Sequence, residues 1–113
     1  MSQYIAPVIK DNLECEIKGA PSIDGSYGDM LTLMDFMHWM SSIVLDERGC
    51  CMDNTRLQYE LDDCLFYKND VIEGIQEECI NDTAYAEYLI ELFNKYIEIL
   101  KFSVDGEYGI RWA

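Results

Sequence analysis

The chain has 113 residues, half of them hydrophobic, and carries 22 Asp and Glu against 8 Lys and Arg, a formal net charge of −14. This length and apolar content predict one folded domain, residues 1–113, with a single core that needs neither metals nor disulfides. So acidic a chain lacks the cluster of Lys and Arg that phosphate contacts require, which argues against direct binding to nucleic acid or to an anionic membrane surface. A basic protein is the expected partner.

The cysteine pattern favours a reducing compartment. The five cysteines are an odd number with two adjacent members: Cys15, Cys50, Cys51, Cys64 and Cys79. The N-terminal sequence MSQYIAPVIKDN has no basic segment followed by an apolar one, and no run of 18 apolar residues predicts a membrane span. We therefore expect free thiols and a cytoplasmic protein, in the host cell cytoplasm if a phage encodes it.

The N-terminal region predicts strands followed by a loop. Residues 13–17 alternate apolar and acidic side chains, which is the period of a half-buried strand. The apolar run at residues 4–9 can pair with it, although Pro7 restricts that strand to a sheet edge or a bulge. Residues 19–28 contain three glycines and a proline and predict a loop.

The first stretch with helical periodicity is residues 29–47, for which Asp29 is the candidate cap. Its apolar arc is rich in methionine, which core filling explains best. Trp39 falls on the polar side, where a bulky apolar group is not expected. His38, the only histidine, stands one turn from Asp35, within reach of a hydrogen bond along the helix.

A second amphipathic stretch runs from Asp53 or Asn54, either of which can cap it, to about residue 80, after a loop at residues 50–52. Its apolar positions share one face and its acids cluster on the opposite face. Residues 68–70 and Gly74 favour a kink or a split into two shorter helices.

The strongest element is residues 83–102, which Asn81 or Asp82 can cap. The polar positions of this helix occupy an arc of about 120°: Glu87, Glu91, Asn94, Lys95, Glu98 and Lys101. A helix that is apolar over more than half its circumference must be surrounded, either by its own chain or by a partner chain.

Asp105 and Gly106 stand between two short strand-like runs, which predicts a C-terminal hairpin. Together the elements predict an α+β fold. Three to four helices surround the central C-terminal helix, about residues 83–102, beside a small antiparallel sheet formed by the N-terminal strands and the C-terminal hairpin.

The second helical stretch also carries the candidate binding site. Its acids recur at intervals that put carboxylates roughly 5 to 10 Å apart, comparable with the separation of successive phosphates along one DNA strand, on the order of 6 to 7 Å. Aromatic side chains within a charged rim are typical of a binding surface. The predicted partner-binding residues are Tyr59, Asp62, Asp63, Phe66, Asp70, Glu73 and Glu77, with Trp39 on the first helix. The alternative is that the acids form only a solvated helix face and the chain itself covers the aromatics.

No stretch carries a catalytic, cofactor or metal motif. The cysteines lack the C-x-x-C spacing of a zinc site, and Gly19, Gly25 and Gly28 fit no phosphate-binding pattern. No cysteine stands at a helical spacing from His38 that would make a nucleophile pair. We therefore expect a protein that is not an enzyme and binds neither cofactor nor metal.

In size and composition the chain is similar to phage anti-restriction and anti-CRISPR proteins, many of which imitate DNA, although no family motif is present. The first hypothesis is a small, acidic, non-enzymatic inhibitor, a monomer or homodimer, that binds a basic surface of a nucleic-acid-handling protein. The second is a bacterial immunity protein that neutralises a basic toxin nuclease. The third is a structural or adaptor subunit whose apolar central helix packs on a partner. A small-molecule enzyme that uses His38 and Asp35 is the last.

Overall fold

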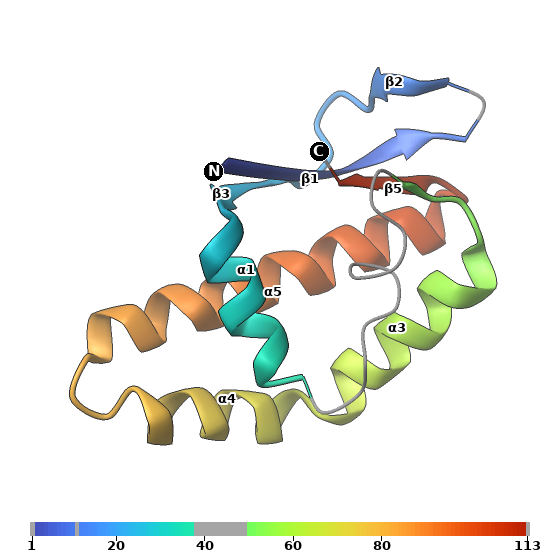
Figure 1. Cartoon of the computed structure of the whole chain (residues 1–113). Coiled ribbons are helices and arrows are strands. Elements are labelled where there is room, and N and C mark those ends of the chain that lie inside the picture. Colours follow the sequence, from blue (N-terminus) through green and yellow to red (C-terminus); the bar gives the residue numbers. More distant parts are fainter. Residues whose placement is uncertain (1, 11, 38–49, 113) are drawn as a thin grey trace.

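The computed structural model describes residues 2–10, 12–37 and 50–112, and it packs a small antiparallel sheet on a layer of helices (Figure 1). The elements in chain order are β1 (Ser2–Ile9), β2 (Asn12–Glu16), β3 (Ile23–Ser26), α1 (Tyr27–Asp35), β4 (Cys50–Cys51), α3 (Asn54–Phe66), α4 (Lys68–Glu78), α5 (Thr83–Asp105) and β5 (Gly109–Trp112). The predicted α+β fold is confirmed, and its longest helix is the one expected at the centre.

β1 lies in the middle of the sheet, whose order is β2-β1-β5-β4, with β3 also paired to β1. Ile5 of β1 lies opposite Ile23 of β3 on one side and Trp112 of β5 on the other. The predicted pairing of β1 with β2 is confirmed, and its register shifts after Val8. Pro7 lies where the partner on that side changes from β3 to β2, so its missing N–H is tolerated in an interior strand.

α5 is the core helix and contacts the sheet and the other helices. Its buried apolar side chains are Ala86, Leu89, Leu92, Phe93, Tyr96, Ile97, Ile99 and Leu100. They are covered by Ile5, Ile23 and Ile110 from the sheet, by Met30 and Leu33 from α1, and by Leu57, Leu61, Val71 and Ile75 from α3 and α4. At about 1.5 to 3 kcal/mol for each large side chain fully buried, this contact surface supplies much of the driving force for folding.

The predicted split of the second amphipathic stretch is confirmed, and it falls at Tyr67. This residue has φ −96° and ψ 10°, outside the regular helical region. The hydrogen bonds nevertheless keep helical spacing across the joint, because Tyr67 N–H donates to the Asp63 carbonyl at 3.0 Å and Val71 N–H donates to the Tyr67 carbonyl at 2.9 Å. Side chains three and four residues apart therefore continue to share one outward face from α3 into α4.

The predicted start of the first helix, with Asp29 as its cap, is wrong. α1 begins at Tyr27, with Ser26 rather than Asp29 in the N-cap position, and ends at Asp35. After it, Phe36 N–H and Met37 N–H donate to carbonyls three residues back, the tighter spacing that often closes a helix. The rest of the predicted helix, with His38 and Trp39, lies outside the described residues.

Three loop or turn predictions are also wrong. The predicted loop at residues 19–28 contains β3, too short to show alternation, and the predicted loop at residues 50–52 contains β4. The predicted C-terminal hairpin does not form, because α5 continues to Asp105 and Gly106 is its C-cap. An Asp-Gly pair is a hairpin signal, but glycine is also a common helix terminator, and here the Gly106 N–H donates to the carbonyls of Phe102 and Val104 at the end of α5.

Candidate partner-binding site

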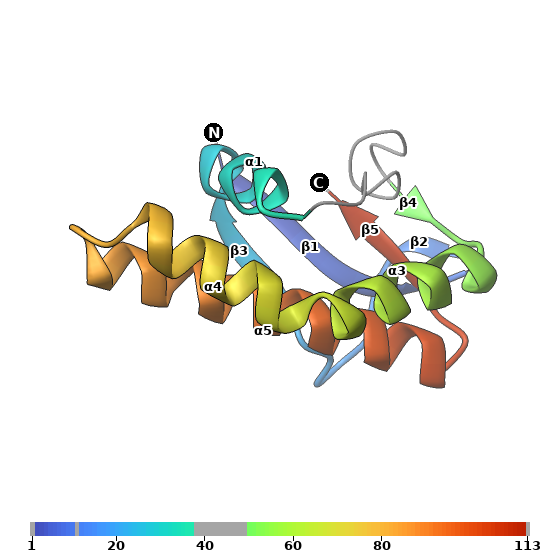
Figure 2. The same cartoon turned by 90° about the horizontal axis from the view of Figure 1, so that it is seen from below.

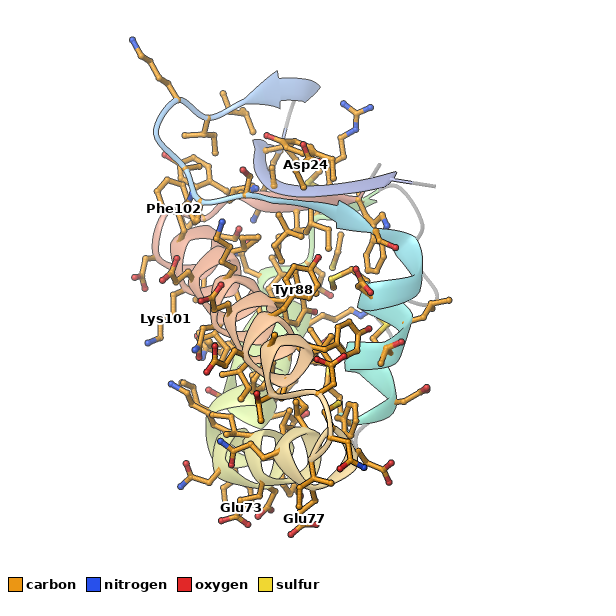
Figure 3. All side chains as sticks on the ribbon, turned by 90° about the vertical axis from the view of Figure 1, so that its left-hand side faces the viewer. Asp24, Glu73, Glu77, Tyr88, Lys101 and Phe102 are labelled. Carbon is orange, nitrogen blue, oxygen red and sulfur yellow. The ribbon has the colours of Figure 1, made fainter. Side chains whose placement is uncertain are left out.

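Seven exposed side chains follow the outward face of α3, α4 and the turn after α4 at intervals of three or four residues. We call this set the outer stripe: Tyr59, Asp62, Phe66, Asp70, Glu73, Glu77 and Ile80. Because the backbone at Tyr67 stays close to helical, the stripe residues of α3 and those of α4 point to the same side of the molecule. In Figure 3, the stripe residues Glu73 and Glu77 point away from α5 and from the sheet.

Three apolar side chains of the stripe are strongly exposed: Tyr59 is 66% exposed, Phe66 80% and Ile80 71%. Phe66 packs edge-on against Tyr67, with ring centroids 4.8 Å apart and an interplanar angle of 81°. Tyr67 is half-buried and packs against the core. Phe66 is thus held by a neighbour that the core fixes in place, and it has less rotamer freedom to lose when a partner covers it.

The stripe carboxylates on α4 are unpaired among the described residues. The side chains of Asp70, Glu73 and Glu77 make no hydrogen bond or ion pair within the part of the chain that the structure describes. Asp62 on α3 accepts a hydrogen bond of 2.8 Å from Gln58 Nε2. The exposed lysines of the described chain lie elsewhere: Lys10, Lys18, Lys95 and Lys101. Lys68, the half-buried first residue of α4, is the only cation on that helix, so a negative potential runs along it from Asp70 onward.

One predicted binding residue, Asp63, is not part of the outer stripe. Asp63 is half-buried, off the stripe, and its carbonyl oxygen accepts the N–H of Tyr67 at the joint. Trp39 lies outside the described residues. The sequence interpretation also missed Ile80, which sits in the turn after α4. Its spacing of three residues from Glu77 is the signal that could have found it.

The inner side of α3 carries a buried polar pair. Glu60 is 5% exposed, and Tyr96 of α5 donates a hydrogen bond of 3.1 Å to its Oε2 atom. Cys64, one turn further along α3, is fully buried. Desolvation raises the pKa of the Cys64 thiol far above its ordinary value of 9.0, and the neighbouring Glu60 and Asp63 raise it further. A thiol that is buried and kept protonated in this way is a poor nucleophile.

A second polar cluster fastens α1 to α5. The Tyr85 hydroxyl donates a hydrogen bond of 2.9 Å to Oδ1 of Asp29, the residue that the sequence interpretation took for a helix cap. The rings of Tyr85 and Tyr88 stack with centroids 6.2 Å apart. Desolvation, and then Asp29, raise the pKa of both phenols above 10.0. Both phenols are neutral at physiological pH, and the hydrogen bond from Tyr85 to Asp29 holds α1 against α5.

Two hollows flank α4. A groove of about 460 Å³ between α1 and α4 is lined by Thr32, Asp35, Phe36, Gly74, Glu77 and Glu78. A second, which we call the hairpin groove, lies between the end of α4 and the start of α5 and measures about 220 Å³. Its lining residues are Gln76, Cys79, Ile80, Thr83, Ala86, Glu87 and Ile90.

No described helix is both long enough and apolar enough to cross a membrane. Within residues 2–10, 12–37 and 50–112, no group of three or more His, Cys, Asp or Glu side chains is arranged to hold a metal ion. Comparison of the chain with protein-family models, with curated proteins and with solved structures finds no match.

Proposed function

We propose that this protein is a small non-enzymatic inhibitor that acts in the cytoplasm. In this proposal the outer stripe binds a basic surface of a nucleic-acid-handling protein and excludes the nucleic acid from it. One observation carries the proposal: Asp70, Glu73 and Glu77 form an exposed row of carboxylates, unpaired among the described residues, next to the exposed ring of Phe66.

The spacing of the acids supports this function. Residues three or four apart on a helix are separated by about 4.5 to 6 Å along its axis, and phosphates along one DNA strand by a distance on the order of 6 to 7 Å. A groove that binds phosphates can therefore bind such a row, and the release of its bound anions favours the exchange. The carboxylates accelerate association at low salt, and the aromatic side chains slow dissociation.

The other hypotheses differ in how much support they have. A bacterial immunity protein that neutralises a basic toxin nuclease would use the same surface, so the identity of the bound protein distinguishes it. The adaptor hypothesis requires another chain to complete the apolar arc of α5, and most of that arc is buried within this chain, although Tyr88 is exposed. The enzyme hypothesis rested on His38, which lies outside the described residues.

A capture experiment with a charge-matched control tests the proposal. The wild-type protein, a stripe variant (Asp70→Asn, Glu73→Gln, Glu77→Gln) and a control variant (Glu91→Gln, Glu98→Gln, Asp105→Asn) are immobilised and exposed to host lysate at low and high salt. All three control positions are exposed on α5, and the control removes the same number of charges.

We expect the wild type and the control variant to retain a basic protein that the stripe variant loses. High salt and an excess of duplex DNA should each release that protein, because both compete for its basic surface. Equal capture by the two variants, or capture that duplex DNA leaves intact, would contradict the proposal.

A further inference from the structure

The end of the hairpin formed by α4 and α5 stands clear of the sheet. Figures 1 and 2 show the end of α4 and the start of α5 side by side, projecting past the strands. The hairpin groove opens there, with Ile80, Ala86 and Ile90 as aliphatic lining residues and Glu87 as its charged one. Because Ile80 is also the last member of the outer stripe, the groove continues the acidic surface.

The charge around this groove is of one sign. Between residues 69 and 94 the sequence contains no Lys, Arg or His, and it contains seven acids: Asp70, Glu73, Glu77, Glu78, Asp82, Glu87 and Glu91. A second copy of the same hairpin would bring like charges together without counter-ions from either chain, which disfavours self-association at this place. Charge complementarity favours a cationic occupant.

We propose that the hairpin groove receives one aliphatic side chain from a basic segment of the partner protein. Lysine or arginine residues beside that side chain face Glu87 on α5, the charged residue that lines the groove. This inference rests on the proposed function, and it assigns to the hairpin groove the task of selecting one basic partner among many. The acidic row attracts many basic surfaces, whereas the groove selects those that place an aliphatic side chain between cations.

The acidic row and the hairpin groove contribute to binding in different ways. Exposed carboxylates act at long range and are screened by salt, so they govern the association rate and discriminate poorly between basic partners. An aliphatic side chain gains free energy only where apolar surface is removed from water. The groove of about 220 Å³ supplies such surface next to the exposed Ile80.

The test uses two synthetic peptides as probes. Both are lysine-rich and helical and have the same charge; one carries a single central leucine and the other an alanine at that position. Binding is measured by calorimetry. The alkylation rate of Cys79, a half-buried lining residue, reports occupancy of the groove. Cys50 on β4, at the opposite end of the molecule in Figure 2, is the internal reference.

We expect the leucine peptide to bind on the order of tenfold more tightly than the alanine peptide. It should also slow alkylation of Cys79 and leave that of Cys50 unchanged. Ile80→Ser should abolish the preference for leucine. The control Leu65→Ser, which changes an exposed aliphatic side chain of α3 outside the groove, should retain it.

Equal affinities for the two peptides, or unchanged alkylation of Cys79 in the leucine complex, overturn the inference. In that case, salt-sensitive binding of both peptides still agrees with the proposed function of the stripe, so the two failures are distinguishable. Failure of both peptides to bind overturns the inference as well. Protection of Cys79 when the concentration of the protein alone is raised would identify a second copy as the occupant, again against the inference.

Discussion

Tyr96 of α5 donates a hydrogen bond of 3.1 Å from its hydroxyl group to Oε2 of Glu60 on α3, inside the interface between the two helices. Both side chains are buried. A carboxylate removed from water is costly unless hydrogen bonds stabilise it, so this contact favours one relative position of α3 and α5 over others. The outer stripe lies on the opposite side of α3. The direction in which the stripe residues of α3 point therefore depends on how this buried pair orients α3 against α5.

The substitution Tyr96→Phe removes the hydroxyl donor and keeps the ring. We expect the free energy of unfolding to fall by about 1.5 to 3 kcal/mol, the range for a hydrogen bond to a charged group. Urea denaturation followed by circular dichroism measures this change. Tyr59→Phe, at an exposed position, should change the stability by less than about 0.5 kcal/mol. Equal stability of Tyr96→Phe and wild type would show that the buried hydrogen bond contributes nothing.

Glu77 lies near the C-terminal end of α4, where the helix dipole disfavours an acid, and four residues from Glu73, a like charge. We therefore expect Glu77→Gln to stabilise the protein by about 0.3 to 1 kcal/mol at low ionic strength. Thermal denaturation at low and high salt measures the gain, which should shrink at high salt. Asp70→Asn is the control, since Asp70 occupies the first turn of α4 and should yield no gain. A destabilised Glu77→Gln protein would refute this account.

Burial protects the Cys64 thiol from reaction. Because its pKa lies far above 9.0, almost no thiolate exists in the folded state at pH 8. In native protein at that pH, iodoacetamide should modify the half-buried Cys50 and Cys79 and leave Cys64 unmodified until the protein unfolds. Mass spectrometry of the digested protein measures the three rates. Modification of Cys64 as fast as that of Cys79 would contradict the burial seen here.

The same thiol makes stability depend on pH. A raised folded-state pKa means that the contribution of Cys64 is complete below about pH 9 and is lost as pH rises above it, because the unfolded chain ionises first. Near pH 10 the loss should reach about 1.4 kcal/mol. Tyr85 and Tyr88 act in the same direction from about pH 10 upward. Urea denaturation at pH 8 and pH 10 under reducing conditions should show a smaller loss for Cys64→Ala than for wild type.

Gly109 begins β5 at a place where no side chain fits. A Cβ atom there would overlap Met52 Sδ and would lie 3.0 Å from the carbonyl oxygen of Cys51, a backbone atom of β4. We expect Gly109→Ala to destabilise the protein by about 1 to 3 kcal/mol through strain at the β4–β5 contact. Gly28→Ala is the control, since Gly28 lies in α1, a Cβ there would make only an ordinary contact with Ser26 Oγ at 3.6 Å, and the variant should gain about 0.5 to 1 kcal/mol. Thermal denaturation of both variants compares the effects.

Local chemistry explains what the sequence predicted correctly. The side chain of Asp53 accepts N–H groups at the start of α3, and that of Asp82 does so at the start of α5, as their positions before amphipathic stretches indicated. The apolar periodicity of residues 83–102 identified the core helix. It did not identify the C-terminal end, because Asp105 and Gly106 can end a helix as well as form a hairpin turn.

Long-range packing explains what the sequence could not predict. β3 and β4 are too short for a recognisable period, and both are strands only because β1 and β5 lie beside them. The exposure of Tyr59 and Phe66 depended on whether another layer covers α3, which helical spacing alone cannot decide. Asp63 and Glu60 are near neighbours of the exposed acids in the sequence, yet one is half-buried and the other fully buried.

The pairing of Ile5 with Trp112 joins strands more than a hundred residues apart. Closing so large a loop costs conformational entropy, and a high proportion of distant contacts slows folding. The α4–α5 hairpin involves only neighbouring segments and can form early, whereas β1 lacks its β5 neighbour until residues 109–112 dock beside it. We therefore expect sheet closure to be the slow kinetic step, with the helical layer already assembled as the template on which the last strand docks.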